Sequence, residues 1–354
     1  MQHRPFKHFG IYIDIARQIE RPHVLFEAIK GMGRLGYTHC MVNLEDAFLF
    51  KRHPGIARQN AYTVEFMREF ELLCASEGME LIPAIPSLSH CHYITTKKGY
   101  EKYDEGRGTD NNWGTVSPSF PETYTLLGEL YEDWCNYIPG SYIQLGLDEA
   151  AAMGNYHCRT WGKETFDYTR MFAEHANKLN KMCKSLGRRM IIGGDMFYYI
   201  PQAIDLVDND IIILDWFYYR FDKKTRVEAF NFSDIDLSGD LKKKGFEVWG
   251  TAAVWPNSPF CDVEDRWGQF CDWVRYGREK NLEGLVLCDF ENNTGFYGSV
   301  HILMKAFATN INRPKMRPIK NELANVLADK LQVSENNPRL TAFVNDVMNL
   351  GQYH

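Results

Sequence analysis

Short apolar runs rich in β-branched residues alternate along the chain with longer segments in which apolar residues recur every three or four positions. The short runs are typical of buried strands and the longer segments of amphipathic helices. Eight strands are predicted, at residues 8–15, 38–44, 80–85, 141–147, 189–194, 210–215, 246–251 and 282–288. Eight helices are predicted to follow them, at residues 24–35, 64–77, 122–137, 164–186, 201–207, 234–244, 264–280 and 300–312.

This strict alternation predicts an α/β protein with a single-domain (β/α)8 TIM barrel, in units that average about 38 residues. The alternative is an open doubly wound sheet, which is disfavoured because no glycine-rich phosphate loop follows the first strand. We assign residues 1–315 to the barrel. Residues 316–354 form a C-terminal extension, in which helices at 321–331 and 339–350 are expected to pack on the barrel.

The composition is that of a globular protein, since 45% of the 354 residues are hydrophobic and 24% are charged. A net charge of −6 argues against nucleic acid as a partner. No apolar run reaches the roughly 18 residues of a membrane helix or resembles a signal peptide, so we expect a cytoplasmic protein. Secretion of a longer precursor and assembly into a homo-oligomer are left open. The nine cysteines lack metal-binding spacing and are expected to be free thiols.

The residues at the predicted strand ends are acidic and aromatic. In a barrel these ends surround the ligand, so the residues there are the candidates for the functional site. They include Asp14 and Arg17, Asn43 and Asp46, His90 and His92, Asp148 and Glu149, Asp195, Asp215 to Tyr219, Trp249 and Trp255, and Asp289 and Glu291. The long irregular segment at 86–118 follows the third strand on the same side, and we expect it to be functional.

Carboxylates beside aromatic side chains suit a neutral, hydroxyl-rich substrate. Aromatic rings stack on sugars, while carboxylates bind hydroxyls and supply acid catalysis, which points to a glycosidase. A metal site competes with this interpretation, but the chain has no HExxH motif and its HxH motif, at 90–92, lies in the long loop. We therefore expect neither a metal nor another cofactor.

The adjacent acids Asp148 and Glu149 are the sharpest feature. Because neighbouring carboxylates repel each other, one of them is expected to keep a proton and act as a general acid. An acidic pair at a helix N-terminus, favoured by the helix dipole, is the structural alternative. Context has to decide between the two.

The sequence around this acidic pair and at the other strand ends resembles that of a known family. Residues 141–149 read Ser-Tyr-Ile-Gln-Leu-Gly-Leu-Asp-Glu, which resembles the fourth-strand motif His-x-Gly-Gly-Asp-Glu of the family 20 glycoside hydrolases, the β-N-acetylhexosaminidases. Asp14-Ile-Ala-Arg17 is similar to the Asp-x-x-Arg that ends the family's first strand, and the run from Pro86 to His90 to its Pro-Gly-His. Order and spacing agree over residues 8–150, whereas the second half agrees only in architecture.

The resemblance implies a retaining, exo-acting enzyme with substrate-assisted catalysis. Glu149 would be the acid and base, and Asp148 would hold the substrate's 2-acetamido group, whose oxygen attacks the anomeric carbon. Asp46 and His90 would form a relay that orients Glu149. Arg17 would bind sugar hydroxyls. The expected outer parts of the site are Trp216 as a wall of the acetamido pocket, Tyr218 or Tyr219 as a hydrogen-bond donor to the acetamido oxygen, Trp255 as a stacking platform, and Glu291 as a ligand of an outer hydroxyl.

The chain departs from the family pattern at several positions. Gln144 replaces the motif's His, and Leu147 replaces its second Gly. The family's Tyr after strand seven and its Trp-x-Glu after strand eight have no clear counterparts, and the small domain that commonly precedes the barrel is expected to be missing. These changes put the sugar in doubt more than the reaction.

Two alternatives stay open at this stage. One is a related barrel glycosidase for a sugar without the acetamido group, using Glu149 with a separate carboxylate such as Asp215 or Glu291. The other is a non-catalytic sugar-binding barrel. Independently of both, single residues have structural alternatives: Trp216 and Trp249 would be ordinary barrel core, one of the two tyrosines would point away from the site, and Glu291 would pair with an arginine at the rim.

Overall fold

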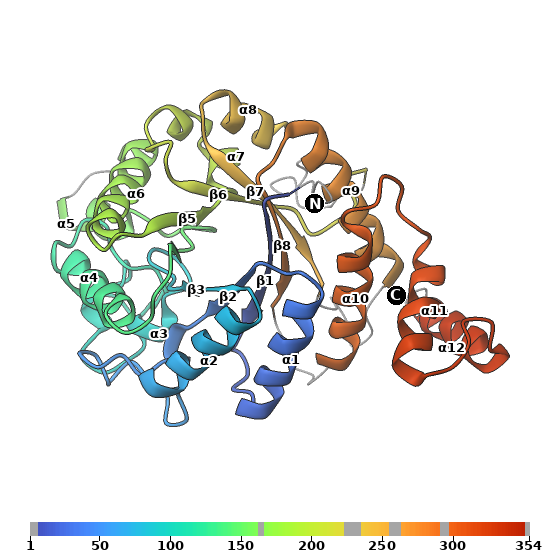
Figure 1. Ribbon diagram of the computed structural model, residues 1–354. Coiled ribbons are helices and arrows are strands. Elements are labelled where there is room, and N and C mark those ends of the chain that lie inside the picture. The colour runs from blue at the N-terminus through green and yellow to red at the C-terminus, as the bar shows by residue number, and fades with distance from the viewer. Residues whose placement is uncertain (1–5, 162–165, 223–234, 255–262, 291–296, 351–354) are drawn as a thin grey trace.

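The computed structural model describes residues 6–161, 166–222, 235–254, 263–290 and 297–350. Its centre is a closed barrel of eight parallel strands in chain order, in which the last strand pairs with the first (Figure 1). The strands are β1 His8–Asp14, β2 His39–Asn43, β3 Glu80–Ala84, β4 Tyr142–Gln144, β5 Arg189–Gly193, β6 Ile212–Trp216, β7 Glu247–Ala253 and β8 Gly284–Asp289. The predicted (β/α)8 barrel is confirmed.

Helices surround the barrel on its outer side (Figure 1). They are α1 Pro22–Arg34, α2 Val64–Ser76, α3 His92–Thr95, α4 Glu122–Cys135, α5 Asn155–Trp161, α6 Tyr168–Ser185, α7 Met196–Tyr199, α8 Leu237–Lys243, α9 Val263–Lys280, α10 Tyr297–Asn310, α11 Ile319–Leu331 and α12 Pro338–Leu350. Short 3-10 helices occur at Glu45–Ala47, Glu101–Tyr103 and Pro201–Asp205. No helix of the described ranges has the length and apolar character needed to cross a membrane.

The strands are apolar on both faces because both faces are buried. In β1, Tyr12 points into the barrel and packs with Met41 and Val286, whereas Ile11 and Ile13 point outward against the helices. Alternate residues thus build two cores, one inside the barrel and one between barrel and helices. The inner core leaves the carboxyl ends of the strands open.

Several elements differ from the sequence-based prediction: α5 was not predicted, and the helix expected at 201–207 is the 3-10 helix Pro201–Asp205. Two further differences have a clear local cause. Strand β4 ends at Gln144, three residues early, because Gly146 and Leu147 take left-handed backbone conformations with φ of 70° and 68°. The helix predicted at 164–186 begins at Tyr168, where the Asp167 carboxylate accepts a hydrogen bond from the Arg170 N–H at 2.9 Å. Both differences come from local backbone chemistry rather than from the hydrophobic pattern.

The long segment between β3 and α4 is ordered by its own hydrogen bonds. Asp104 accepts bonds from the backbone N–H groups of Gly106, Trp113 and Thr115. The Cys91 N–H donates to the Gly114 carbonyl at 2.7 Å, which ties the two ends of the segment together. The start of the segment, including His90, is thereby fixed beside the end of β4.

Candidate active site

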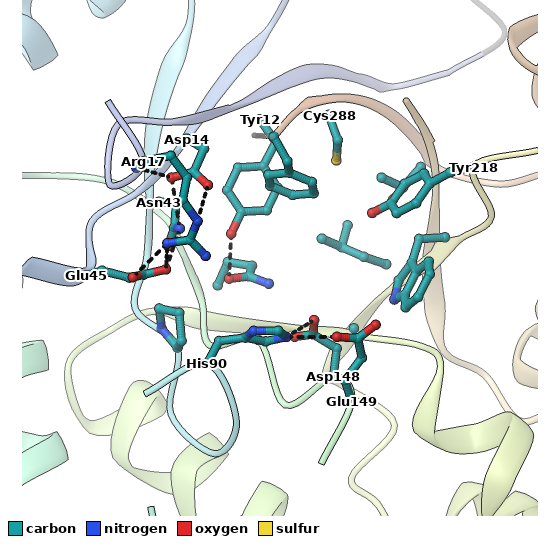
Figure 2. A pocket seen from close by; sticks show the side chains of 18 of the residues that line it. Tyr12, Asp14, Arg17, Asn43, Glu45, His90, Asp148, Glu149, Tyr218 and Cys288 are labelled. Carbon is teal, nitrogen blue, oxygen red and sulfur yellow. Dashed lines mark hydrogen bonds and ion pairs between the residues drawn. The ribbon is translucent and has the colours of Figure 1, made fainter. Parts of the chain in front are cut away.

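A cavity of about 370 Å³ opens at the carboxyl ends of the strands (Figure 2). It falls within the usual size range of small-molecule sites. Its floor consists of side chains from the inner barrel core, among them Tyr12, Leu214 and Cys288, together with the buried Gln144. Its walls include Asp14, Arg17, Asn43, Glu45, Pro86, His90, Asp148, Glu149, Trp216, Tyr218, Tyr219, Thr251 and Phe290. The site therefore joins residues from both halves of the chain.

The turn after β4 presents Asp148 and Glu149 to this cavity. Leu147 and Glu149 adopt φ values of 68° and 51°, which non-glycine residues rarely do. Two glycines make room for Asp148. A Cβ on Gly193 would lie 2.9 Å from the Asp148 Cβ, and one on Gly146 would lie 3.1 Å from an Asp148 carboxylate oxygen.

His90 links the two acids. Its Nε2 lies 3.3 Å from Oδ2 of Asp148 and 3.3 Å from Oε2 of Glu149 (Figure 2). Hydrogen bonds to Asp148 and then to Glu149 raise the pKa of His90 to about 11, although desolvation of this partly exposed side chain acts to lower it. Burial acts to raise the pKa of Asp148, but the hydrogen bond and charge of His90 outweigh it, so that this pKa is lowered. His90 is therefore an imidazolium at neutral pH.

A second network lies across the cavity, where Arg17 is held by carboxylates from β1 and from the 3-10 helix after β2. Its Nη1 lies 3.0 Å from both carboxylate oxygens of Glu45, and its Nε lies 3.7 Å from Asp14. Asn43 donates to Asp14 at 3.2 Å and to Glu45 at 2.9 Å. Burial raises the pKa of Glu45, and the charge of Arg17 opposes that shift. The network fixes the guanidinium at the cavity wall.

Asp46 is placed differently from the sequence-based prediction. Its carboxylate accepts from Arg58 Nε at 2.8 Å and from Lys97 Nζ at 3.0 Å, so the described contacts form no relay to His90. The preceding residue, Glu45, takes a φ of 39° and faces the cavity in its place. Two adjacent acids at a strand end point in different directions, and the sequence pattern could not say which one points inward.

The aromatic wall contains Trp216, Tyr218 and Tyr219, as predicted. Trp216 and Tyr218 stack on each other with ring centroids 5.0 Å apart and planes inclined by 18°. Burial and the nearby Cys288 raise the pKa of Tyr218 well above its ordinary value, which keeps its hydroxyl protonated as a donor. Trp249 instead lies fully buried in the inner barrel core, stacked on His8 with centroids 4.6 Å apart.

His90, Asp148 and Glu149 also have the donor atoms of a metal site. One ligand atom each from His90, Asp148 and Glu149 lie within 4.8 Å of one another, a spacing that fits a divalent metal. The same two carboxylates hold a proton on His90, so a proton and a metal ion would compete for these atoms.

Two residues predicted to bind the substrate, Trp255 and Glu291, lie outside the described residues.

Some residues of the cavity were not predicted from the sequence. Tyr12 donates a hydrogen bond from its hydroxyl to Gln144 Oε1 at 3.4 Å on the cavity floor, and Glu45 holds Arg17. The alternation of inward and outward residues along β1 and β4 was the signal that would have placed Tyr12 and Gln144 inside the barrel.

No protein-family model and no curated protein matches this sequence. Solved structures do match over nearly the whole chain. A β-N-acetylhexosaminidase from Bacteroides fragilis aligns with a TM-score of 0.70 and 16% identity, over 92% of this chain and 70% of its own. The chain has the fold of this hexosaminidase barrel.

Two further structures share this fold. The Flavobacterium johnsoniae chitobiase aligns with a TM-score of 0.70 and 16% identity over 99% of this chain, which spans 56% of that protein. A family 20 catalytic module of the pneumococcal exo-β-D-N-acetylglucosaminidase StrH aligns with a TM-score of 0.62 and 19% identity, over 97% of this chain and 98% of its own. At such low identity the likeness establishes the fold, and the activity has to be argued from the site.

Proposed function

We propose that this protein is an exo-acting, retaining β-N-acetylhexosaminidase of the family 20 type. The observation that carries the proposal is the placement of His90 between Asp148 and Glu149, 3.3 Å from each, in the mouth of this barrel. The named activities of the similar structures, a β-N-acetylhexosaminidase, a chitobiase and an exo-β-D-N-acetylglucosaminidase, support it. The closed cavity floor suits a terminal sugar, which is the substrate of an exo-acting enzyme.

The side chains of the two acids differ in solvent exposure, and we assign them different roles on this basis. The Glu149 side chain is 47% exposed and the Asp148 side chain 28%. Glu149, nearer to solvent, protonates the glycosidic oxygen and later takes a proton from the attacking water. Asp148, deeper in the cavity, accepts a hydrogen bond from the N–H of the substrate's acetamido group and orients its carbonyl oxygen toward the anomeric carbon.

The reaction then proceeds in two displacements. The acetamido oxygen forms a bond to the anomeric carbon while the bond to the aglycone breaks, which gives an oxazolinium intermediate. Water opens the intermediate from the opposite face, so the configuration is retained. The negative charge of Asp148 stabilises the positive charge that develops on the acetamido group. The proton on His90 lies within reach of both acids.

The remaining cavity residues bind the sugar. Arg17, fixed by Glu45 and Asp14, donates to hydroxyls on the side of the ring opposite the acid pair. The stacked Trp216 and Tyr218 form an apolar wall for the acetamido methyl group, and the hydroxyl of Tyr218 or Tyr219 donates to its carbonyl oxygen.

A glycosidase that uses Asp215 as a separate nucleophile is disfavoured by the position of this residue. Asp215 is buried and accepts hydrogen bonds from Tyr198 at 3.1 Å and Ser238 at 2.5 Å, and it is not part of the cavity wall. In β6, Leu214 and Trp216 face the cavity, so the residue between them faces the outer helices.

A panel of 4-nitrophenyl β-glycosides tests the proposal. We expect turnover of the N-acetylglucosaminide or N-acetylgalactosaminide at least about 100-fold above that of the matching glucoside or galactoside. Equal turnover of the sugars without the acetamido group would contradict substrate assistance. Binding of N-acetylhexosamine without any turnover would identify a sugar-binding barrel instead.

A further inference from the structure

Asp195 lies directly behind the acid pair, two residues after the end of β5 and just before α7. It is 1% exposed, and its Oδ2 accepts a hydrogen bond from the backbone N–H of Glu149 at 2.7 Å. The neighbouring Met196 makes a parallel but weaker contact, with its Sδ 3.4 Å from the Ala150 N–H. Asp195 and Met196, at the start of α7, thus contact two consecutive backbone N–H groups of the turn that carries the acids, and of the two only Asp195 contacts that of Glu149.

The second oxygen of Asp195 has no described partner. Its Oδ1 is buried from solvent without a hydrogen bond in the described part of the chain. Burial, followed by the charge of Asp148, raises the pKa of Asp195 to about 8, although the bond from Glu149 acts to lower it. A buried carboxyl with an unsatisfied oxygen destabilises the fold. Its presence beside the acid pair therefore indicates a functional role.

The backbone conformation of Glu149 indicates what this role is. Its φ of 51° lies in the left-handed region, which costs a non-glycine residue free energy unless surrounding contacts impose it. The direction of the Glu149 side chain follows from this backbone conformation. A hydrogen bond to its own N–H group is the most direct way to impose the conformation, and Asp195 makes that bond.

We propose that Asp195 is a positioning residue that aims the general acid Glu149 at the glycosidic oxygen through this backbone hydrogen bond. The inference rests on the proposed role of Glu149. Asp195 lies behind the turn and acts on the reaction through Glu149. Its loss should therefore weaken proton donation to the leaving group more than it weakens the other steps.

The test compares leaving groups within each variant. A 3,4-dinitrophenyl aglycone departs as a stable anion without a proton, whereas a 4-methoxyphenyl aglycone of similar size needs one. For Asp195→Ala we expect kcat/KM of the 4-methoxyphenyl N-acetyl-β-hexosaminide to fall about 10-fold or more beyond any fall for the dinitrophenyl substrate. The ratio of the two rates does not depend on the folded fraction, since misfolding lowers both equally.

Three further variants sharpen the test. Asp195→Asn keeps an oxygen acceptor for the Glu149 N–H and should restore the wild-type ratio within about 3-fold. Met196→Leu removes the parallel contact to Ala150 at similar volume and should leave the ratio unchanged. Glu149→Gln removes the acid itself and should give the largest difference in kcat/KM between the 4-methoxyphenyl and dinitrophenyl substrates.

The outcomes separate the two proposals. An equal loss on both substrates in Asp195→Ala, a ratio in Asp195→Asn as low as in Asp195→Ala, or the same effect in Met196→Leu would overturn the role of Asp195. If Glu149→Gln itself shows no leaving-group effect, the acid is misassigned, and the proposed function fails with this inference.

Discussion

Arg17 is clamped by Glu45, whose two carboxylate oxygens both lie 3.0 Å from its Nη1. Glu45 is 7% exposed, whereas the Arg17 side chain is 42% exposed at the cavity. The buried acid thus holds a cation that reaches the substrate side. Because long side chains lose rotamer freedom on binding, holding Arg17 in place beforehand would lower the free-energy cost of binding a sugar hydroxyl in the proposed role of this residue.

Glu45→Gln should release this clamp. We expect kcat/KM for an N-acetyl-β-hexosaminide to fall about 10-fold, mainly through a higher KM, because the neutral amide holds the guanidinium less firmly. The matched control is Asp46→Asn, since Asp46 is bound to Arg58 and Lys97 away from the cavity wall. Steady-state kinetics of the two folded variants check this, and a larger loss in Asp46→Asn would restore the role first predicted for Asp46.

The charge on His90 should make stability depend on pH. Its folded pKa of about 11 lies above its ordinary value of 6.5, so the stabilisation it provides is complete below about pH 6.5 and is lost as pH rises toward 11. The urea midpoint of the wild type should therefore exceed that of His90→Asn most at low pH, and the difference should vanish near pH 11. A difference that stays constant between pH 6 and pH 11 would show that His90 is not charged through this interaction.

Leu147 should be a strained residue. It is fully buried with φ of 68°, at the position where the family motif has glycine. In Leu147→Gly, relief of roughly 1–2 kcal/mol of strain offsets part of the lost burial, so we expect a net loss of about 1–3 kcal/mol in the free energy of unfolding. Leu145→Gly, equally buried but outside the left-handed region, should lose about 2 kcal/mol more. Urea unfolding checks this, and equal losses would argue against strain.

The barrel could be predicted because eight apolar strand patterns alternate with helical ones and connections between parallel strands have a fixed hand. The early end of β4 could not, because a leucine gives no sign that it will take a positive φ. The start of α6 at Tyr168 was signalled by Asp167 as a cap, but the apolar periodicity extended the predicted helix further.

The site was predictable as far as strand ends converge on one mouth. That convergence places Arg17, His90, Asp148, Glu149 and Trp216 around the cavity, as expected. It does not give side-chain direction, so Glu45 and Asp46 could not be distinguished. Nor does it give contacts between neighbouring strand ends, such as the bond from the Glu149 N–H to Asp195.

The central claim is that the substrate's own acetamido oxygen, oriented by Asp148, is the nucleophile. The most direct test uses aryl β-glycosides whose N-acetyl group carries zero, one, two or three fluorine atoms, because each fluorine withdraws electrons from that oxygen while the sugar stays the same. We predict that kcat/KM falls steadily with each fluorine added. A rate that stays constant across the series would contradict the account and would place the nucleophile on the protein.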